Sequence, residues 1–452
     1  MGTSFSNITG NEGISRALGF VMTLNYSYKQ RYAVDYSMRL DASSQFGKNN
    51  RMAPFWSAGL RWNAEKEEFV KCLGIFDELI LRGSYGVTGS QDFSPYQALQ
   101  AYTYEGMMKA YKSFDVVGAK LYSMGNPDLK WQKTKDYNVS LDFSILKNLI
   151  SAKVEYYHKH TENTLLDYAL APSVGFSNVK DNLGTISNKG VEATLRVMPY
   201  SNPSKQAYMN IVVTGARNKS TIEKISNALK YQNEQQIAKT DTRPLPRYES
   251  GYSQTIIWAV PSMGIDPISG EEVFLKRNGA LTSVWNAADQ SSMGDTEPKF
   301  AGTYSVNFQY KGFGFTLAGT YKWGGQMYNY TLLDKVENAN LRMNVDRRVL
   351  TDRWKEVGDK AFFKKLDGDA QRENTKASSR FIMDENEFTL KTINLSYRMD
   401  AQRQRGLAKA GIGALTVGMY VEDVLRLSTV KMERGIDYPF SRSVSLSLNV
   451  VF

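Results

Sequence analysis

The chain has 452 residues and a formal net charge of +10, and 42% of its residues are hydrophobic. No stretch approaches the roughly 18 consecutive apolar residues that a membrane-spanning helix needs, which excludes a helical membrane protein. Lysine and arginine are spread along the chain rather than clustered, which argues against a nucleic-acid partner, and the single cysteine, Cys72, cannot form an internal disulfide.

Alternation of apolar and polar residues is the main signal for secondary structure, and it begins near the N-terminus. In residues 17–28 an apolar face alternates with a face of small polar residues, which is the period of a β-strand. Residues 31–40 repeat the pattern, and only residues 29–30 separate the two segments, so we expect a hairpin. Asp35 and Arg39 share the polar face of the second strand, which predicts contact with water there.

The same pattern predicts thirteen strands in all. After the first two, we expect strands at 54–63, 77–86, 130–143, 149–160, 187–198, 207–217, 301–310, 313–323, 387–398, 412–421 and 441–452. In one of them Phe388 and Leu390 have the opposite parity from Ile393, which predicts a β-bulge near Lys391 or Thr392. Helical character is confined to the loops.

The connections between these strands alternate in length along most of the chain. Short ones are expected at 29–30, 64–76, 145–148, 199–206, 311–312 and 399–411, and mostly long ones at 41–53, 87–129, 161–186, 218–300, 324–386 and 422–440. An up-and-down barrel in an outer membrane has short periplasmic turns and long extracellular loops. We therefore predict an all-β fold, an antiparallel transmembrane β-barrel, with the C-terminus, Phe452, on the periplasmic side.

Lipid cannot hydrogen-bond a bare strand edge, so a spanning sheet must close on itself. Barrels with a plugged lumen have about 22 strands. We therefore expect residues 1–452 to form the C-terminal part of such a barrel, with about nine strands supplied by upstream polypeptide or a second chain. Tyrosine and tryptophan near the strand ends would form the girdles at the level of the lipid headgroups. These are Tyr26, Tyr28, Tyr32, Trp56, Trp62, Tyr156, Tyr310, Tyr321 and Trp323.

Five short motifs occur in an order typical of one family. They are the Asp-x-Ser-Ser-x-Phe-Gly motif at 41–47, LRGSYGVTGSQ at 81–91, GIDPISGE at 264–271, GDTEPKF at 294–300 and DRW at 352–354. Together with the aromatic-ended last strand, they resemble the SusC-like (SusC/RagA) family of TonB-dependent outer-membrane transporters.

The resemblance implies TonB-dependent import of nutrients, either glycans and oligosaccharides or peptides, across a Gram-negative outer membrane. It also implies a SusD-like surface lipoprotein as partner. The family's signal peptide, N-terminal domain, plug and TonB-contacting segment all lie upstream of the matched region. We therefore expect contact with TonB only through that upstream part.

No catalytic or cofactor motif is present, so we expect neither an enzyme nor a bound cofactor. His158 and His160 could face one side of a strand and bind a metal, but no third ligand is visible nearby, and a polar strand end is the favoured interpretation. Asp367 and Asp369 resemble a calcium loop only loosely, and a solvated turn is favoured there. We predict no metal site.

Aromatic residues in the long loops are the candidates for substrate binding, because aromatic faces stack on sugar rings and peptide side chains. They are Trp258, Trp285, Tyr328 and Tyr330. The alternative is that they pack the loops together or against a lipoprotein. For the whole chain, the alternative function is a soluble or secreted β-rich adhesin or structural protein, which leaves the sorting of the loops by length unexplained.

Overall fold

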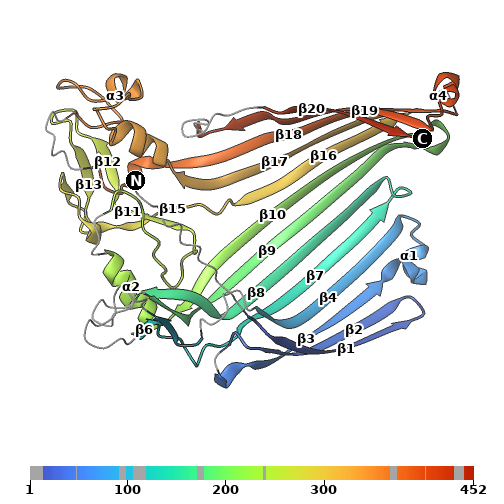
Figure 1. Ribbon diagram of the computed structural model, residues 1–452, viewed down its shortest axis with the longest axis horizontal. Coiled ribbons are helices and arrows are strands. Elements are labelled where there is room, and N and C mark those ends of the chain that lie inside the picture. Colours follow the sequence, from blue (N-terminus) through green and yellow to red (C-terminus); the bar gives the residue numbers. More distant parts are fainter. Residues whose placement is uncertain are drawn as a thin grey trace, which may run out of the picture.

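The protein is described by a computed structural model over residues 14–46, 48–90, 98–104, 119–169, 178–237, 241–366, 374–402, 404–431 and 442–452. Thirteen strands form one antiparallel sheet whose order follows the chain (Figure 1). They are β1 (Ala17–Tyr28), β2 (Tyr32–Ser43), β3 (Met52–Asn63), β4 (Phe76–Ser90), β7 (Gln132–Ile145), β8 (Ile150–Ala169), β9 (Asn178–Asn202), β10 (Ala207–Ile225), β16 (Phe300–Tyr310), β17 (Phe313–Tyr328), β18 (Ile382–Asp400), β19 (Ala414–Ser428) and β20 (Val444–Val451). All thirteen predicted strands are confirmed.

The details of pairing also follow the sequence pattern. Lys29 and Gln30 both have positive φ, 50° and 55°, so the β1–β2 hairpin closes through the two-residue turn that suits twisted strands. The register of β18 against β19 shifts between Leu390 and Thr392, which confirms the predicted bulge. β1 and β20 are the two edges of the sheet in the described part of the chain.

The pairing places apolar and polar side chains on opposite faces. For example, Phe20 lies opposite Leu40, which in turn lies opposite Pro54, while Asn25 lies opposite Asp35 on the other face. All nine tyrosines and tryptophans expected in the girdles fall on the apolar face by this register. Because this face is exposed along the whole sheet, as with Leu446 at 79% and Leu448 at 68%, its apolar side chains are placed for contact with lipid rather than with a protein core.

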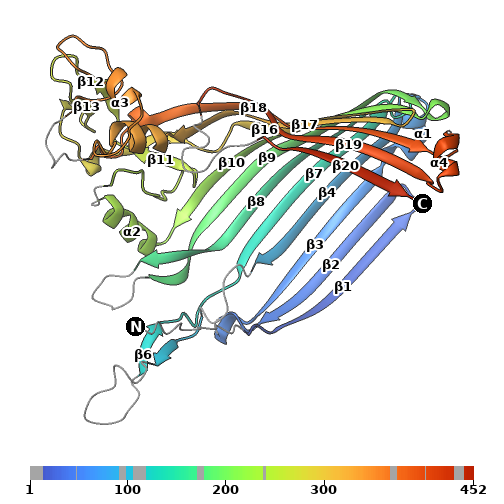
Figure 2. The same cartoon turned by 45° about the horizontal axis from the view of Figure 1, so that its top comes forward.

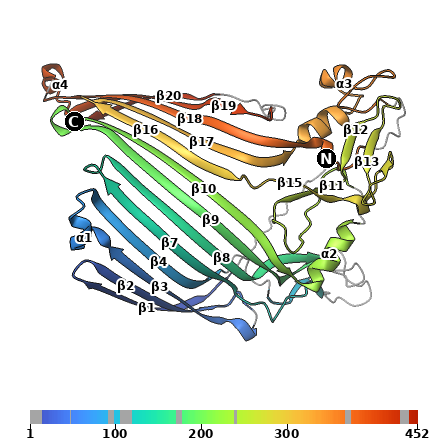
Figure 3. The same cartoon turned by 180° about the vertical axis from the view of Figure 1, so that it is seen from behind.

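The two ends of the sheet differ, as predicted from the lengths of the connections. Figures 1 and 3 show the short turns at one end, with α1 (Glu68–Lys71) and α4 (Arg405–Lys409), and the long loops at the other. Figure 2 shows the strands twisting as they run between these ends. The loop end holds α2 (Asn227–Ile237), α3 (Arg348–Thr351), a π-helical turn (Leu332–Glu337), and the short strands β5 (Ala101–Tyr104), β6 (Ala119–Ser123), β11 (Ile256–Ala259), β12 (Ser262–Ile265), β13 (Glu272–Leu275), β14 (Leu281–Thr282) and β15 (Ser291–Asp295).

The strands extend further at the loop end than the alternation predicts. β8 continues to Ala169 instead of residue 160, and β18 begins at Ile382 instead of residue 387. Strand pairing continues there although apolar and polar residues no longer alternate cleanly. A strand segment outside the lipid does not need an apolar face. The small sheets of the loops, β5–β6, β11–β15 and β12–β14, were not predicted at all.

Buried apolar clusters lie among the loops. One contains Phe46, Phe55 and Trp131, and a larger one contains Leu333, Val349 and other residues of the 257–381 region. Among the described helices, none is long and apolar enough to cross a membrane. The sheet therefore gets its stability from strand pairing, while the loops have cores of their own.

Candidate functional site

The polar face of the sheet is lined by charged side chains that pair across strands. Arg82 bridges to Asp142 at 3.0 Å between β4 and β7, and Arg426 bridges to Glu387 at 2.6 Å between β18 and β19. Threonine hydroxyls bond across β17 and β18 on the same face, such as Thr320 with Thr389 at 2.6 Å. This face is suited to contact with water, because charged and hydroxyl side chains line it and pair across its strands.

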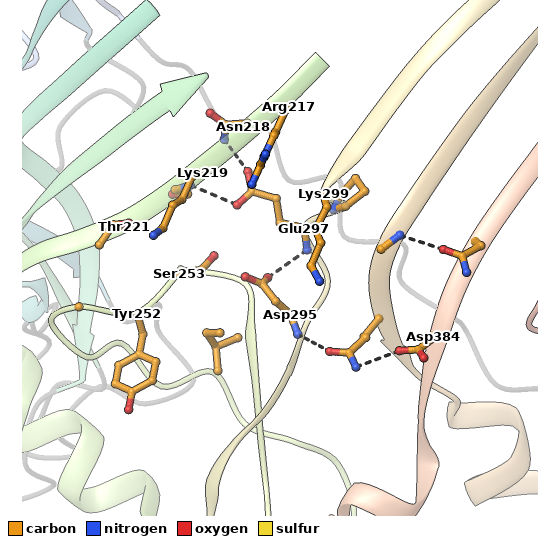
Figure 4. A pocket seen from close by; sticks show the side chains of 17 residues that line it. Arg217, Asn218, Lys219, Thr221, Tyr252, Ser253, Asp295, Glu297, Lys299 and Asp384 are labelled. Atoms are coloured by element: carbon orange, nitrogen blue, oxygen red, sulfur yellow. Dashed lines mark hydrogen bonds between the residues drawn. The ribbon is translucent and has the colours of Figure 1, made fainter. Parts of the chain in front are cut away.

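A polar cavity of about 620 Å³ lies at the loop end, where β10 continues beyond the end of β16 (Figure 4). The last paired residue of β10 on that side is Ala216, so the next part of its edge lacks a strand neighbour. Glu297 fills this gap, because its carboxylate accepts hydrogen bonds from the side-chain amide of Asn218 and from the backbone N–H of Ser220 at 3.2 Å. The cavity wall is thus made by the loops as well as by the strands.

The opposite side of the cavity is a chain of hydrogen bonds that joins β15 to β17 and β18. The N–H of Asp295 donates to Gln326 Oε1 at 3.1 Å, and Gln326 Nε2 donates to Asp384 Oδ1 at 3.0 Å (Figure 4). Arg217, Lys219 and Lys299 also line the cavity. With both charge signs and many donors, such a wall suits a polar ligand better than an apolar one.

Four buried charged residues join loop segments between residues 272 and 380. Arg380 Nη2 lies 2.8 Å from Glu272 Oε2 and 3.0 Å from Glu337 Oε1, and Arg353 lies 4.0 Å from Glu337. Arg353 also donates to the carbonyls of Val336, Glu337, Val349 and Lys364. Because each charge is paired and hydrogen-bonded, the cluster fixes the geometry of segments that are far apart in sequence.

Burial and charge act in opposite directions on this cluster. Burial by itself would raise the pKa of Glu337, but the Arg380 guanidinium, with further help from Arg353 and the hydroxyl of Thr375, holds that pKa below its usual value. Burial likewise opposes the charge of Arg380, and the two carboxylates nevertheless raise its pKa. Glu337 and Arg380 are therefore charged at neutral pH, and removing one of them leaves a buried charge with a partner fewer.

The short motifs of the sequence mark contacts within this assembly. Asp266 of GIDPISGE accepts hydrogen bonds from the N–H groups of Ile268 and Ser269, which closes the turn. Trp354 of DRW donates its indole N–H to the carbonyl of Pro267 at 2.9 Å, so these two motifs pack together. Phe46, from the first motif, is fully buried and stacks on Trp131 with centroids 4.0 Å apart, while Gly47 lies outside the described residues.

The four aromatic residues predicted to bind substrate differ in how far they are exposed. Trp258 is 3% exposed, lies under the Arg247 guanidinium and donates to the carbonyl of that residue, and Tyr328 is 4% exposed within the larger loop core. Trp285 is partly buried and donates to the carbonyl of Ala377. Tyr330 is 43% exposed, with its ring beside Tyr328. Tyr330 is the most exposed of the four, with the Arg243 guanidinium over its ring.

The two histidines lie among polar partners in the middle of β8, because this strand continues past the end that the sequence predicted. His158 Nε2 is 3.0 Å from the hydroxyl of Ser187, and His160 lies between Glu162 and Glu223. In the described residues no group of three or more His, Cys, Asp or Glu side chains is arranged to hold a metal ion. Asp367 and Asp369 lie outside the described residues.

Sequence reasoning missed the buried ion-pair cluster, although part of its signal was present. Arg353 is the central residue of the DRW motif, and Glu272 directly follows GIDPISGE. Arg380 and Glu337 have no marker of their own, since a charged residue in a loop is normally solvated. Only the packing of the loops shows that these residues meet.

Comparison with known proteins agrees with this architecture. The family model described as "TonB dependent receptor-like, beta-barrel" matches residues 2–248, more than half of the chain. The chain belongs to this family.

Relatives of this TonB-dependent receptor barrel confirm the resemblance to the SusC-like family. TonB-dependent receptor P39 of Formosa agariphila is 24% identical over 99% of this chain and 47% of its own length. TonB-dependent receptor SusC of Bacteroides thetaiotaomicron is 31% identical over 183 residues, which is 39% of this chain and 18% of SusC.

Among solved structures, that of the RagAB peptide transporter superimposes with a TM-score of 0.81 and 23% identity, over 96% of this chain and 48% of the other. This likeness establishes the fold of a TonB-dependent outer-membrane barrel. The TonB-dependent receptor chain spans about half the length of the curated relatives that it matches along its whole length.

Proposed function

We propose that this chain forms the C-terminal part of the barrel of an outer-membrane transporter that imports nutrients, oligosaccharides or peptides, with energy delivered through TonB. The observation that carries the proposal is the division of one sheet into a lipid-facing apolar side and a polar side lined by cross-strand charges. A soluble adhesin has no use for an exposed apolar belt on every strand. The relatives named as TonB-dependent receptors and the RagAB peptide transporter support the same class of function.

The two open edges of the sheet imply that further strands are needed to close the barrel. Edge strands β1 and β20 each present unpaired backbone groups, and these must be paired inside lipid. We expect further strands, together with a plug and a segment that contacts TonB, from upstream polypeptide or a second chain. The long loops are proposed to face the cell exterior, which places Phe452 at the periplasmic side.

A surface lipoprotein of the SusD-like type is the proposed partner of the loop end. Leu341, Met343 and Leu350 lie on the same loop and are each at least half exposed. Apolar side chains in a polar loop are a common feature of protein interfaces. The buried ion-pair cluster would hold this surface in shape for docking.

The proposal divides the four loop aromatics into two roles. Tyr330, which is 43% exposed and has the Arg243 guanidinium over its ring at 5.1 Å, is the residue that would contact substrate. Trp258, Trp285 and Tyr328 would instead support the loops from inside, since their rings or N–H groups are used in packing.

Growth assays test the function. A strain that lacks the gene should fail to grow on one class of nutrient, oligosaccharide or peptide, as sole carbon source, and the wild-type gene should restore growth. Tyr330→Ala should reduce uptake of that nutrient, whereas Tyr231→Ala, at an equally exposed tyrosine (44%) on α2, should leave it unchanged. Equal growth of the deletion strain on every oligosaccharide and peptide tested would refute import of these nutrients.

A further inference from the structure

Toward the loop end, the outer face of strands β7 to β10 carries two rows that contain basic residues, and the row nearer the short turns is called the basic row below. The register places Lys135, His160, Ser187 and Thr221 side by side, and one step nearer the short turns it places Tyr137, His158, Lys189 and Lys219 side by side. The next row holds the apolar side chains of Val139, Tyr156 and Val191 on β7 to β9 and ends with Arg217 on β10. The basic row thus directly adjoins the tyrosines of the lipid-facing belt.

Two lysines on this face, Lys189 and Lys219, place like charges next to each other. Lys189 and Lys219 are direct cross-strand partners on the same face of the sheet. Like charges in that position repel and destabilise the pairing. Within the described residues, neither lysine has a carboxylate within ion-pair distance, whereas the nearby Lys135 is bound to Glu162 and His160 lies between two glutamates. An external anion between Lys189 and Lys219 would relieve this repulsion.

The position of the row indicates what kind of anion this is. Both lysines are exposed, and they lie beyond the apolar belt on the side of the long loops. With those loops outside the cell, the row is level with the headgroups of the outer leaflet, while Tyr156 and Val191 below it, each 44% exposed, contact acyl chains. A ligand that satisfies both parts has phosphate groups above and several acyl chains below.

We propose that the outer face of β8 to β10 binds a phosphorylated glycolipid of the outer leaflet, the lipid A part of lipopolysaccharide. Lys189 and Lys219 contact a phosphate, and the tyrosine and valine row packs against the acyl chains. The inference depends on the orientation given under the proposed function. It adds a lipid site on the outer face of the sheet, next to the polar cavity that Lys219 also lines.

Binding of purified lipid A to the detergent-solubilised protein tests the proposal. Bis-phosphorylated lipid A should bind the wild type, and K189A/K219A should weaken binding about tenfold or more, since each lysine near an anionic headgroup contributes about one kcal/mol. Dephosphorylated lipid A should bind the wild type as weakly as bis-phosphorylated lipid A binds the double variant. The matched control K147A/K205A removes two lysines at the short-turn end of the sheet and should bind as the wild type does.

Several outcomes would overturn the assignment. Equal binding of lipid A by the wild type and K189A/K219A would do so, as would equal binding of the two lipid forms. Competition by inorganic phosphate alone at low millimolar concentration would reduce the row to a simple anion site. Binding of poly-glutamate that requires the two lysines, with lipid A binding unchanged, would assign the row to an acidic protein. These measurements need no nutrient, so they can fail while the growth assays succeed, and the reverse.

Discussion

Replacing Arg380 by alanine tests whether the buried ion-pair cluster holds the long loops in shape. The Arg380 side chain is 4% exposed and is shared between Glu272 and Glu337, which are 3% and 0% exposed. Among the residues that the structure describes, its removal leaves the Glu272 carboxylate with only the hydroxyl of Ser378, at 2.7 Å, while Glu337 keeps Arg353 at 4.0 Å. Breaking a buried pair in this way costs about 3–5 kcal/mol. Because one carboxylate keeps a cation, we expect the lower end, about 3 kcal/mol, or about a hundredfold in the opening equilibrium of the loops.

Hydrogen exchange of backbone amides measures that opening directly. The amide of Ser379 donates to Val260 at 2.9 Å and that of Asn329 donates to Phe381 at 2.8 Å, and both bonds lie inside the loop assembly. In Arg380→Ala these two amides should exchange about a hundredfold faster, because they exchange when the assembly opens. Amides of β16 in the same sample should keep their wild-type rates, since the sheet does not depend on the cluster.

Two further variants make the test specific. Arg243→Ala removes an exposed ion pair, with Asp334 at 2.6 Å, and should change exchange of the loop amides only slightly. Combining Arg380→Met with Glu272→Gln removes the stranded carboxylate while Glu337 keeps Arg353, and should recover part of the lost protection. If Arg380→Ala and Arg243→Ala both exchange like the wild type, the ion-pair cluster does not hold the loops and the reasoning is refuted.

Three other predictions follow from the geometry. The folded state holds the pKa of Glu337 below its ordinary value of 4.5, so the ionised form stabilises the loops at neutral pH. This stability is lost as the pH falls below 4.5. Exchange rates of the loop amides, corrected for the intrinsic effect of pH, should therefore be constant above that pH and rise below it. A Cβ on Gly302 would lie 1.9 Å from a backbone oxygen of β10, so Gly302→Ala should prevent the sheet from folding. A heat-modifiability gel would then lack the folded band of this variant. Gly83→Ala, where a Cβ meets open space, should migrate like the wild type. Phe46→Ala should destabilise the packing on Trp131 by about 3–5 kcal/mol and expose the loop end to added protease; unchanged cleavage would contradict this.

Sequence reasoning worked best for the sheet, because in a membrane barrel one face of every strand meets lipid and the other meets water. This constraint repeats every two residues, so it is visible in the sequence itself, as in β20, where Leu446 and Leu448 alternate with serines. It even located the bulge between Leu390 and Thr392, where the parity of the apolar residues changes. It was weakest above the lipid, where β8 and β18 continue without alternation.

The candidate site was less accessible to the same reasoning. The loop aromatics were chosen by residue type, and the structure shows that type does not distinguish Trp258, buried under Arg247, from Tyr330, which is open to solvent. The cavity beside Glu297 was also not foreseen, because it depends on where β16 stops relative to β10. Neither property has a local signal in the sequence.

The sequence by itself determined the strand count, the faces of the strands, the sorting of turns and loops, and the family, because each of these depends on neighbouring residues and their contact with solvent or lipid. Only the tertiary structure decided which distant charges meet, such as Arg380 with Glu272 and Glu337, and that Lys189 and Lys219 lie side by side on the outer face. These contacts depend on the register of the strands and on the packing of loops separated by tens of residues. Periodicity carries no information about either.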